Sequence, residues 1–444
     1  MALPSASSLR DDLALGGRIT AMRLAGLALA VRGDPVARLM HKPWRLDPYP
    51  TYAAIRGEGL ARSRVGLSAV GTHALCEQVL RDRRFGVRLA DGRPPFAPEA
   101  ETKQTGEHAD RGARPSDDAE ASLLEPVDLS LLGMDPPDHT RLRRLAAPTF
   151  APRRLQQYRA IAEEVTAGLL DDAAVRGRFD LVRDLAAPLP ITVIARLLAI
   201  PSVDADRFAR WGRALATALD GVRSVSHAHE LARTTAEARE LFTDLVDRRR
   251  ADPGDDVVSG LVEALDAGQM SLDELVSLAQ LLLVAGFETT TNLVGNAVRA
   301  MQATPGQWEA LVEDPTLAAG AVEETLRYDP PVQLTARIAH EETELAGVTF
   351  RRNWGVLVLI AAAGRDPQAH PDPDRFDLRR EQTTPHLAFS GGAHYCLGAA
   401  LARLEGEVAL RMLAERMPGL RPTGRAVPKT ATILRGPRTF PVAA

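Results

Sequence analysis

Residues 389–398 read Phe-Ser-Gly-Gly-Ala-His-Tyr-Cys-Leu-Gly and are followed by an alanine- and leucine-rich helical pattern that ends before Pro418. Cys396 therefore stands just before a helix N-terminus, where the partial positive charge and the free amides favour a thiolate. Gly392 and Gly398 carry no Cβ atom, so the backbone there can approach a flat cofactor closely. A thiolate among amide donors is what an iron ligand of tuned basicity requires.

The longest predicted element is a helix over Leu272–Ala303. Ser271 and Glu274 form a capping-box pattern at its start, and the Thr-Pro pair at residues 304–305 ends it. At about 1.5 Å per residue, the helix would span roughly 45 Å. Residues 281–287 are apolar on every side, so we expect the helix to run through the interior of the protein.

Polar residues follow this apolar stretch at once. Glu288 and Thr289 share a helix face with Ala285, and polar side chains midway along a buried helix are costly unless they have partners or a function. The Thr289 hydroxyl can bond the carbonyl of Ala285 one turn back, which leaves room for a small ligand or a water molecule. Taken alone, a glutamate and a threonine at these positions more often form a locally satisfied buried pair.

The rest of the chain favours a mainly α fold with a minor β portion. Apolar residues recur at helical spacing over 155–170, 191–200, 203–219 and 227–250. Strand patterns are fewer, and they occur over 179–182, 345–350 and 355–360.

Composition excludes some classes of function. The 444 residues carry 54 basic and 58 acidic side chains, a formal net charge of −4, which does not favour nucleic-acid binding. There are two cysteines, too few for a disulfide framework, so we expect a cytoplasmic protein in a reducing compartment. Cys76 lies in an apolar run and is interpreted as an inert buried residue.

Two segments stand apart from the main pattern. Residues 24–31 are an apolar run too short to cross a bilayer, so we expect no stable membrane anchor. An amphipathic helix packed on the body, or a loose extension, is expected instead, and weak contact with a membrane surface stays open. Residues 97–122 are rich in charge, Gly, Pro and Ser, and they predict a polar insert that is either a surface loop or a mobile lid.

The spacing Phe-x-x-Gly-x-x-x-Cys-x-Gly over residues 389–398 resembles the haem-binding signature of the cytochrome P-450 family. Ser390 departs from it, because many members have glycine there, and this affects the geometry of the loop. The resemblance implies the cytochrome P-450 fold, with residues 1–40 as an N-terminal extension and 41–444 as a single catalytic domain. It also implies one haem b (iron protoporphyrin IX), with Cys396 as the axial ligand of the iron.

Further motifs carry the resemblance toward the N-terminus. Residues 285–289 are similar to the family's oxygen-activating motif, which implies that Glu288 and Thr289 are catalytic and relay protons. Residues 134–145 resemble another family segment, in which a Pro-Pro pair starts a helix. The haem-contacting residues implied by the family are His139, Arg143, Ala285, Arg337, Phe389, Gly392, His394 and Gly398. A buried structural network is implied for Glu324, Arg327 and Arg375.

The resemblance implies an oxidoreductase, a monooxygenase that uses dioxygen to hydroxylate or epoxidise a lipophilic small molecule, as in secondary metabolism. The segments expected to face the substrate are 86–130, 203–223, 332–335 and 432–434, together with Phe287. The chain has no room for a flavin or iron–sulfur domain, so electrons are expected from a separate ferredoxin and ferredoxin reductase, and indirectly from NAD(P)H. A basic patch that includes Arg143 and Arg403 is the expected docking site for the ferredoxin.

Three alternatives remain at this stage. The same haem site could couple two rings oxidatively, or it could work with peroxide in place of dioxygen. A haem-binding sensor without catalytic activity is the third.

Overall fold

The structure is a computed structural model that describes residues 6–95, 130–200 and 205–444. The polar insert expected over 97–122 lies outside the described residues.

The helices are α1 (Ala6–Val31), α2 (Pro35–Met40), α3 (Tyr49–Glu58), α4 (His73–Arg81), α5 (Asp138–Ala146), α6 (Pro152–Arg176), α7 (Pro188–Leu197), α8 (Ala205–Ala218), α9 (Val225–Ala251), α10 (Val257–Asp266), α11 (Leu272–Ala303), α12 (Gln307–Glu313), α13 (Ala318–Tyr328), α14 (Ile360–Ala363) and α15 (Ala399–Arg416). The strands are β1 (Leu60–Arg62), β2 (Leu67–Val70), β3 (Phe85–Gly86), β4 (Arg178–Asp180), β5 (Thr335–Ala339), β6 (Thr343–Leu345), β7 (Val348–Phe350), β8 (Gly355–Val358), β9 (Arg421–Pro422), β10 (Val427–Pro428), β11 (Pro437–Thr439) and β12 (Pro441–Ala443).

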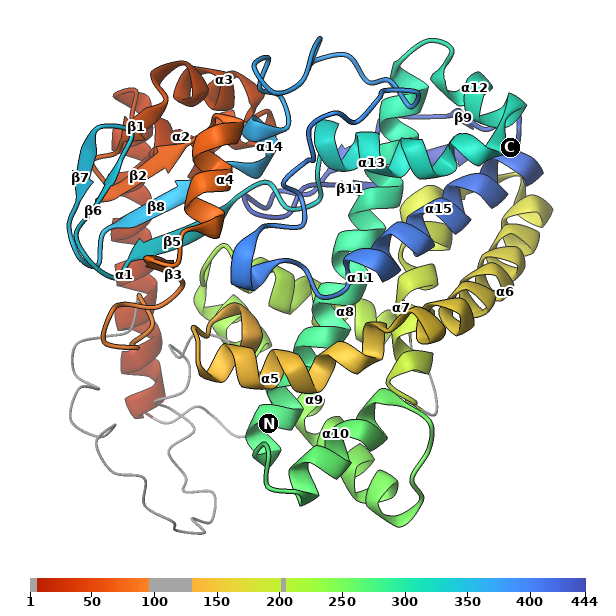
Figure 1. The fold of residues 1–444 in the computed structure, drawn as a ribbon, viewed down its shortest axis with the longest axis horizontal. Coiled ribbons are helices and arrows are strands. Elements are labelled where there is room, and N and C mark those ends of the chain that lie inside the picture. Colours follow the sequence, from red (N-terminus) through yellow and green to blue (C-terminus); the bar gives the residue numbers. More distant parts are fainter. Residues whose placement is uncertain (1–5, 96–129, 201–204) are drawn as a thin grey trace.

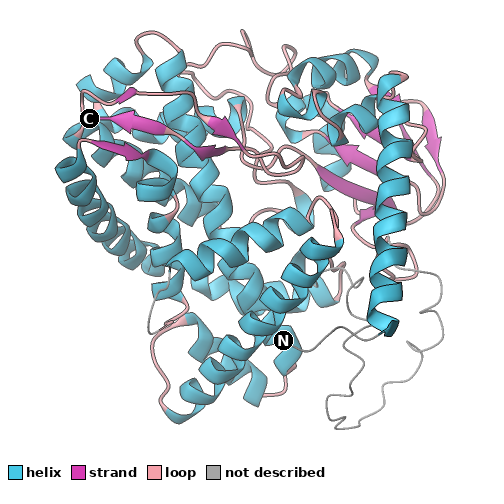
Figure 2. Ribbon diagram, turned by 180° about the vertical axis from the view of Figure 1, so that it is seen from behind, coloured by secondary structure: helices cyan, strands magenta, loops and turns pink. Residues whose placement is uncertain are grey.

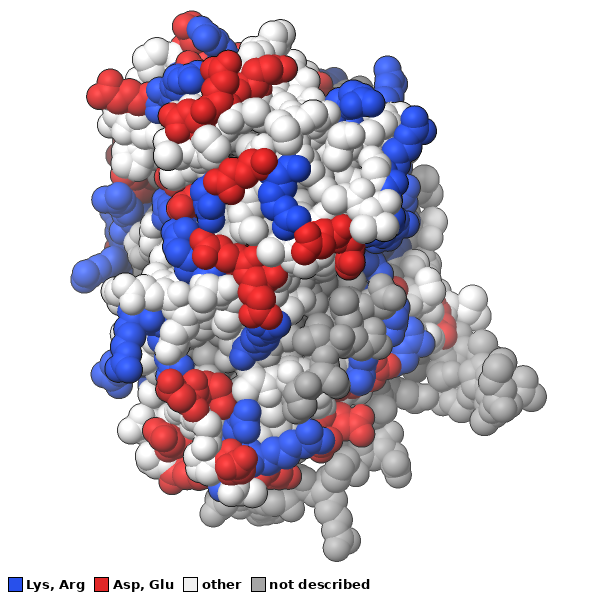
Figure 3. Space-filling view, turned by 90° about the vertical axis from the view of Figure 1, so that its right-hand side faces the viewer, with Lys and Arg blue, Asp and Glu red and all other residues white. Residues whose placement is uncertain are grey.

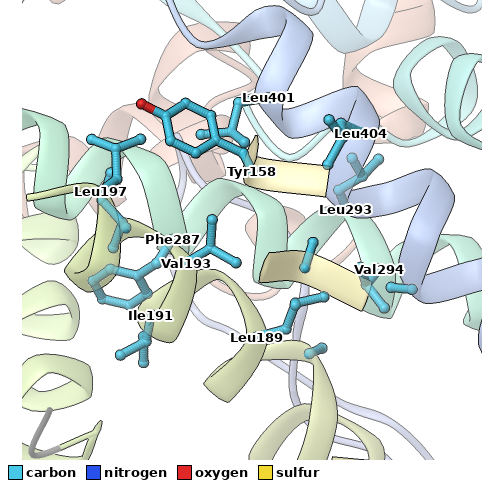
Figure 4. Packing of buried hydrophobic residues seen from close by; sticks show 14 of the residues in the cluster. Tyr158, Leu189, Ile191, Val193, Leu197, Phe287, Leu293, Val294, Leu401 and Leu404 are labelled. Carbon is cyan, nitrogen blue, oxygen red and sulfur yellow. The ribbon is translucent and has the colours of Figure 1, made fainter. Parts of the chain in front are cut away.

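Helix α11 crosses the middle of the molecule, as predicted (Figure 1). The Ser271 hydroxyl accepts a hydrogen bond from the Glu274 amide, and the Glu274 carboxylate accepts one from the Ser271 amide, so the predicted capping box is confirmed. Apolar side chains of α6, α7, α11 and α15 pack together in the largest hydrophobic core (Figure 4). The labelled side chains in that view include Tyr158, Ile191, Leu293 and Leu404.

The β portion lies at two sides of the helical body (Figure 2). A five-stranded sheet has the order β1-β2-β8-β5-β3, in which β2 and β8 are parallel and the other neighbours are antiparallel. The C-terminal segment forms the hairpin β10–β11 and joins β4 through β12 in a three-stranded sheet. These sheets position Arg337 on β5 and Lys429 directly after β10.

Ion pairs tie α6 to α15 at the surface. Arg159 lies 3.1 Å from Glu407, and Arg411 lies 2.8 Å from Glu163. On the side of the molecule where these helices end, acidic and basic side chains are interspersed (Figure 3). No large region of a single charge sign is visible among the described residues on that face, which agrees with the balanced composition.

Most predicted elements are confirmed with shifts at their ends. The predicted strand over 179–182 is shorter, because the Asp180 carboxylate accepts hydrogen bonds from the amides of Val182 and Arg183 and so caps a π-helical turn over Val182–Ala186. The predicted strand over 355–360 ends at Val358, and α14 follows.

The N-terminal region forms a helix packed on the body, one of the two expected forms, and this helix is longer than the apolar run. The apolar run at 24–31 is the end of a much longer helix, α1, and Asp12–Val31 within it has a mean hydropathy of 1.3. By length and composition, this stretch is long enough to cross a membrane, and 11% of it is buried. Val36 and Leu39 of α2 lie in a hydrophobic cluster with Leu357 of β8. We therefore propose that the catalytic domain begins at α2, not at residue 41.

The predicted network around Glu324 and Arg327 is fully buried, but its third member differs. The Arg327 guanidinium lies 2.7 Å from the Glu324 carboxylate and donates to the carbonyls of Gly364, Pro373 and Arg375. The side chain of Arg375 does not complete this network, because it is two-thirds exposed and faces Asp377 at 3.9 Å.

Arg380 supplies the second guanidinium, which bonds the Glu324 carboxylate at 3.1 Å. Position 375 therefore contributes a backbone carbonyl to Arg327, and position 380 contributes the charge.

We predict that Arg327→Met lowers the free energy of unfolding by about 3–5 kcal/mol, because it leaves the Glu324 carboxylate buried without its main partner. Arg375→Met should change it by less than about 0.5 kcal/mol, because its side chain is exposed. Urea unfolding followed by circular dichroism measures both. Equal losses for the two variants would contradict this assignment.

Candidate haem-thiolate site

The loop before α15 is closed by its own backbone. The Cys396 amide donates to the Phe389 carbonyl at 2.8 Å, and the Tyr395 amide donates to the Gly392 carbonyl at 3.2 Å. Phe389 is buried, and the Arg403 guanidinium lies 4.5 Å from the centre of its ring. These contacts fix the direction of Cys396, whose side chain is exposed.

Two residues of this loop have left-handed backbone conformations. Gly392 has φ 62°, and a Cβ atom there would lie 2.5 Å from the Leu80 carbonyl oxygen, so glycine is required. Ser390 has φ 62° as well, at the position where many members of the family have glycine. The loop thus tolerates the substitution at the cost of some backbone strain. At Gly398 a Cβ atom would meet Phe150 at an ordinary 3.7 Å, so this face of the protein does not require glycine there.

The electrostatic surroundings of Cys396 contain opposing effects. Burial raises the pKa of its thiol, whereas a hydrogen bond from the Gly398 amide and the charges of Arg143 and Arg403 lower it. Part of the Cys396 side chain is accessible to solvent, although protein atoms surround most of its sulfur. Cys76 is fully buried and its Sγ lies 3.5 Å from the Val70 carbonyl, which agrees with an inert core residue.

The residues expected to contact the haem propionates come together from three elements. The rings of His139 on α5 and His394 in the loop lie 4.4 Å apart. Burial lowers the pKa of His139 to about 4, with further lowering by the charges of His394, Arg143 and Arg337. Asp135 lies 3.8 Å from His394; burial raises its pKa, but hydrogen bonds from His394 and two backbone amides lower it to about 2.

The surroundings of Arg337 indicate which kind of ligand the cluster of His139, His394 and Arg337 could bind. The Arg337 guanidinium is buried and donates to Thr335, to the Ala336 carbonyl and, at 3.3 Å, to Ser390. Among the described residues, no acidic side chain forms an ion pair with it. Burial lowers its pKa to about 10, although Asp135 opposes the shift. A buried cation without a carboxylate partner fits a ligand that brings carboxylates of its own, as haem does.

The middle of α11 has the predicted local geometry. The Thr289 hydroxyl donates to the Ala285 carbonyl at 2.8 Å. Ala285 is exposed and Thr289 is half-buried, whereas Leu281–Val284 and Phe287–Glu288 are buried. The helix thus has one accessible position within its buried stretch, on the face that carries Thr289.

The partner of Glu288 is a lysine that was not predicted from the sequence. The ammonium of Lys429 lies 2.5 Å from the Glu288 carboxylate and 2.7 Å from the Asn292 side-chain oxygen. Lys429 directly follows β10, 141 residues away along the chain. A lysine in a late loop gives no periodic signal, so only the fold could reveal this ion pair.

The expected substrate-facing role of Phe287 is wrong. Its side chain is 2% exposed and packs into the main core near Ile191 and Val193 (Figure 4). Gly212 of α8 makes room for the Phe287 ring, because a Cβ atom there would overlap it. Two other expected segments do meet, since Val332 forms a β-bridge with Leu434.

Comparisons with known proteins agree with this geometry. The family model for cytochrome P-450 matches residues 305–417. The putative cytochrome P-450 140 of Mycobacterium tuberculosis is 38% identical over 439 residues, which cover 97% of this chain and 96% of the relative. The chain belongs to the cytochrome P-450 family.

Other members of the family support the assignment. The cytochrome P-450 monooxygenase PikC of Streptomyces venezuelae is 40% identical over 409 residues, with 89% of this chain and 91% of PikC covered. The crystal structure of ligand-free CYP164A2 of Mycobacterium smegmatis superposes with a TM-score of 0.80 at 37% identity, covering 92% of this chain and 99% of the other. This chain is thus a cytochrome P-450 monooxygenase with the mainly α fold that the sequence predicted.

A further buried carboxyl of this cytochrome P-450, that of Glu405, links α15 to α11. Glu405 is fully enclosed, and burial raises its pKa to about 8, although a hydrogen bond with Thr290 opposes the shift. The protonated form is therefore the stable one at neutral pH in the folded protein.

We predict that Glu405→Gln flattens the pH dependence of stability. Between the ordinary pKa of glutamate and about 8, the folded protein holds a proton that the unfolded chain releases, so wild-type stability falls as pH rises, by up to about 1.4 kcal/mol per pH unit. Thermal unfolding from about pH 5 to about pH 8 measures this. Glu415→Gln, at a half-exposed position of the same helix, is the control. Parallel curves for wild type and Glu405→Gln would contradict the prediction.

Proposed function

We propose that this monooxygenase holds haem b through the Cys396 sulfur and inserts one oxygen atom into a lipophilic small molecule. The observation that carries the proposal is the occurrence, beside the same loop, of an accessible Cys396 and a buried Arg337 that has no acidic partner among the described residues. Haem bound here would supply the activation of dioxygen. His139, Arg143, Arg337 and His394 would hold its propionates.

The loop residues would set the basicity of the sulfur. The Gly398 amide donates to Cys396, and Arg143 and Arg403 add positive charge nearby. These groups favour the thiolate, whereas the enclosing protein disfavours it. Phe389, Gly392 and Gly398 would line the face of the haem next to this loop, and Ala285 would line the opposite face.

Glu288 and Thr289 would hold and deliver protons on the α11 face. The Thr289 hydroxyl is oriented by the Ala285 carbonyl, and the Glu288 carboxylate is anchored by Lys429 and Asn292. Lys429 is thus a positioning residue that fixes the direction of the Glu288 carboxylate. A proton that reaches Thr289 must be replaced through this buried pair.

Electrons would come from a separate ferredoxin and its reductase. Arg143 lies close to Cys396, as a docking cation should, and Arg144 beside it is exposed. Arg403 is less suited than expected, because its guanidinium is held by the Glu323 carboxylate at 2.6 Å. We therefore infer that the docking patch is centred on α5.

The test of this function is reconstitution with a surrogate ferredoxin system under ¹⁸O₂. We predict one ¹⁸O atom per product molecule for a lipophilic substrate that shifts the resting haem spectrum. Thr289→Ala should release peroxide in place of product, while Thr20→Ala, which removes an equivalent i−4 hydrogen bond on an exposed helix, should behave as wild type. Product without ¹⁸O would instead support oxidative coupling, and turnover with peroxide alone would support the peroxide-driven alternative.

A separate prediction concerns Lys429. Lys429→Met should lower product formed per electron by about tenfold, because Glu288 loses its charged partner, whereas Lys429→Arg should retain most coupling. The ratio of product to peroxide, measured across pH, distinguishes this from a general loss of structure. Unchanged ratios in Lys429→Met would show that the ion pair has no part in proton delivery.

A further inference from the structure

Helix α1 is attached to the protein along one side. Ala30 is buried, and a Cβ atom on Gly26 would lie 2.6 Å from the His41 ring, so the glycine lets α1 approach the end of α2 closely. At the other end, the Asp12 carboxylate lies 3.1 Å from His229 of α9. These contacts place α1 along the outside of the body next to the five-stranded sheet (Figures 1 and 2).

The opposite side of α1 is apolar and exposed. Leu13, Leu24 and Val31 are 76%, 64% and 67% exposed. They are 11 and 7 residues apart, about three and two helical turns, so they share one face. Small exposed residues fill the same face between them, namely Gly17, Thr20, Ala21 and Ala28. The Thr20 hydroxyl donates to the Gly16 carbonyl of the same helix, so its donor is satisfied. An apolar hollow at the side of this face is completed by Val225 of α9.

Basic side chains border this face. Arg18, Arg23 and Arg32 are exposed. The acidic residues of α1 are Asp11 and Asp12, at its N-terminal end, and the Asp12 carboxylate faces His229. Large exposed hydrophobic side chains on a soluble surface are unfavourable when they form a continuous stripe. An apolar stripe bordered by arginines is the pattern of a helix that lies in the surface of a membrane containing anionic lipid.

The contacts of α1 argue against a spanning orientation. The Arg23 guanidinium donates to the Arg223 carbonyl, and the His41 ring bonds the Arg23 carbonyl at 3.2 Å. To cross a bilayer, α1 would have to break these bonds and carry Arg18 and Arg23 into hydrocarbon. Lying in the plane of the membrane keeps every contact with the body.

A second copy of the chain fits the face less well. Two copies joined through Leu13, Leu24 and Val31 would bring the bordering arginines of both helices together, and the Asp12 carboxylate is already engaged with His229. Anionic headgroups would neutralise the same charges.

We propose that α1 binds this monooxygenase to the surface of a bilayer that contains anionic phospholipid, with Leu13, Leu24 and Val31 inserted beneath the headgroups. The binding is peripheral and reversible. It does not depend on the assignment of the haem site.

Flotation of the full-length holoprotein with vesicles tests the proposal. Wild type should float with vesicles of equal parts phosphatidylcholine and phosphatidylglycerol, and less with phosphatidylcholine alone. The double variant Leu13→Asp/Leu24→Asp should lower the partition coefficient by about tenfold or more. Val175→Asp, on a side chain of α6 that is 90% exposed, is the matched control and should float as wild type. Arg18→Gln/Arg32→Gln should weaken binding to the anionic vesicles selectively.

Thermal unfolding and haem absorbance confirm that each variant is folded. The proposal is overturned if wild type fails to float with anionic vesicles, or if the double variant floats equally well. A wild-type dimer in analytical ultracentrifugation that the double variant dissociates, without flotation of either, would overturn it in favour of a second copy on this face.

Discussion

The chemistry of the site depends on how one sulfur atom is held. Cys396 lies among protein atoms that raise the pKa of its thiol, while the Gly398 amide and two arginines favour the thiolate. The loop can offer these donors only because the backbone turns sharply at Gly392, where a side chain would collide with the Leu80 carbonyl. The position of α4 is thus linked to the chemistry of the site through one close backbone contact.

Two buried arginines have different partners, and the difference indicates that one stabilises the fold and the other binds a ligand. Arg327 has a carboxylate and three carbonyls around it, so its charge is satisfied within the chain. Arg337 has neutral oxygens as its bonded partners among the described residues, and burial lowers its pKa to about 10. The first braces the core. Burying the charge of Arg337 destabilises the protein unless an anionic ligand binds beside it, which fits a site completed by a cofactor.

Local signals in the sequence predicted the parts of the structure that depend on local physics. The capping box at Ser271 and the Thr289–Ala285 hydrogen bond follow from helix geometry, and both are present. Features that depend on long-range packing were not predictable. Lys429 reaches Glu288 because the C-terminal hairpin folds against α11, and no spacing rule encodes that contact.

Irregular and all-apolar segments account for the errors. The loop after α14 has no period, so the choice between Arg375 and Arg380 could not be made from spacing. The centre of α11 is apolar on every side, so the spacing of its apolar residues could not indicate that Phe287 points toward α8. Helix α1 was underestimated because glycines and arginines interrupt its apolar residues, although they do not end the helix.

The central claim is that the Cys396 sulfur binds haem iron, and the optical spectrum of the ferrous carbonyl form tests it most directly. The account predicts the red-shifted Soret band of a thiolate-ligated haem for wild type, and its replacement by the band of a histidine-ligated haem in Cys396→His. Cys76→Ser should leave the wild-type band in place. A red-shifted band that survives Cys396→His, or wild-type protein that takes up no haem, would contradict the account.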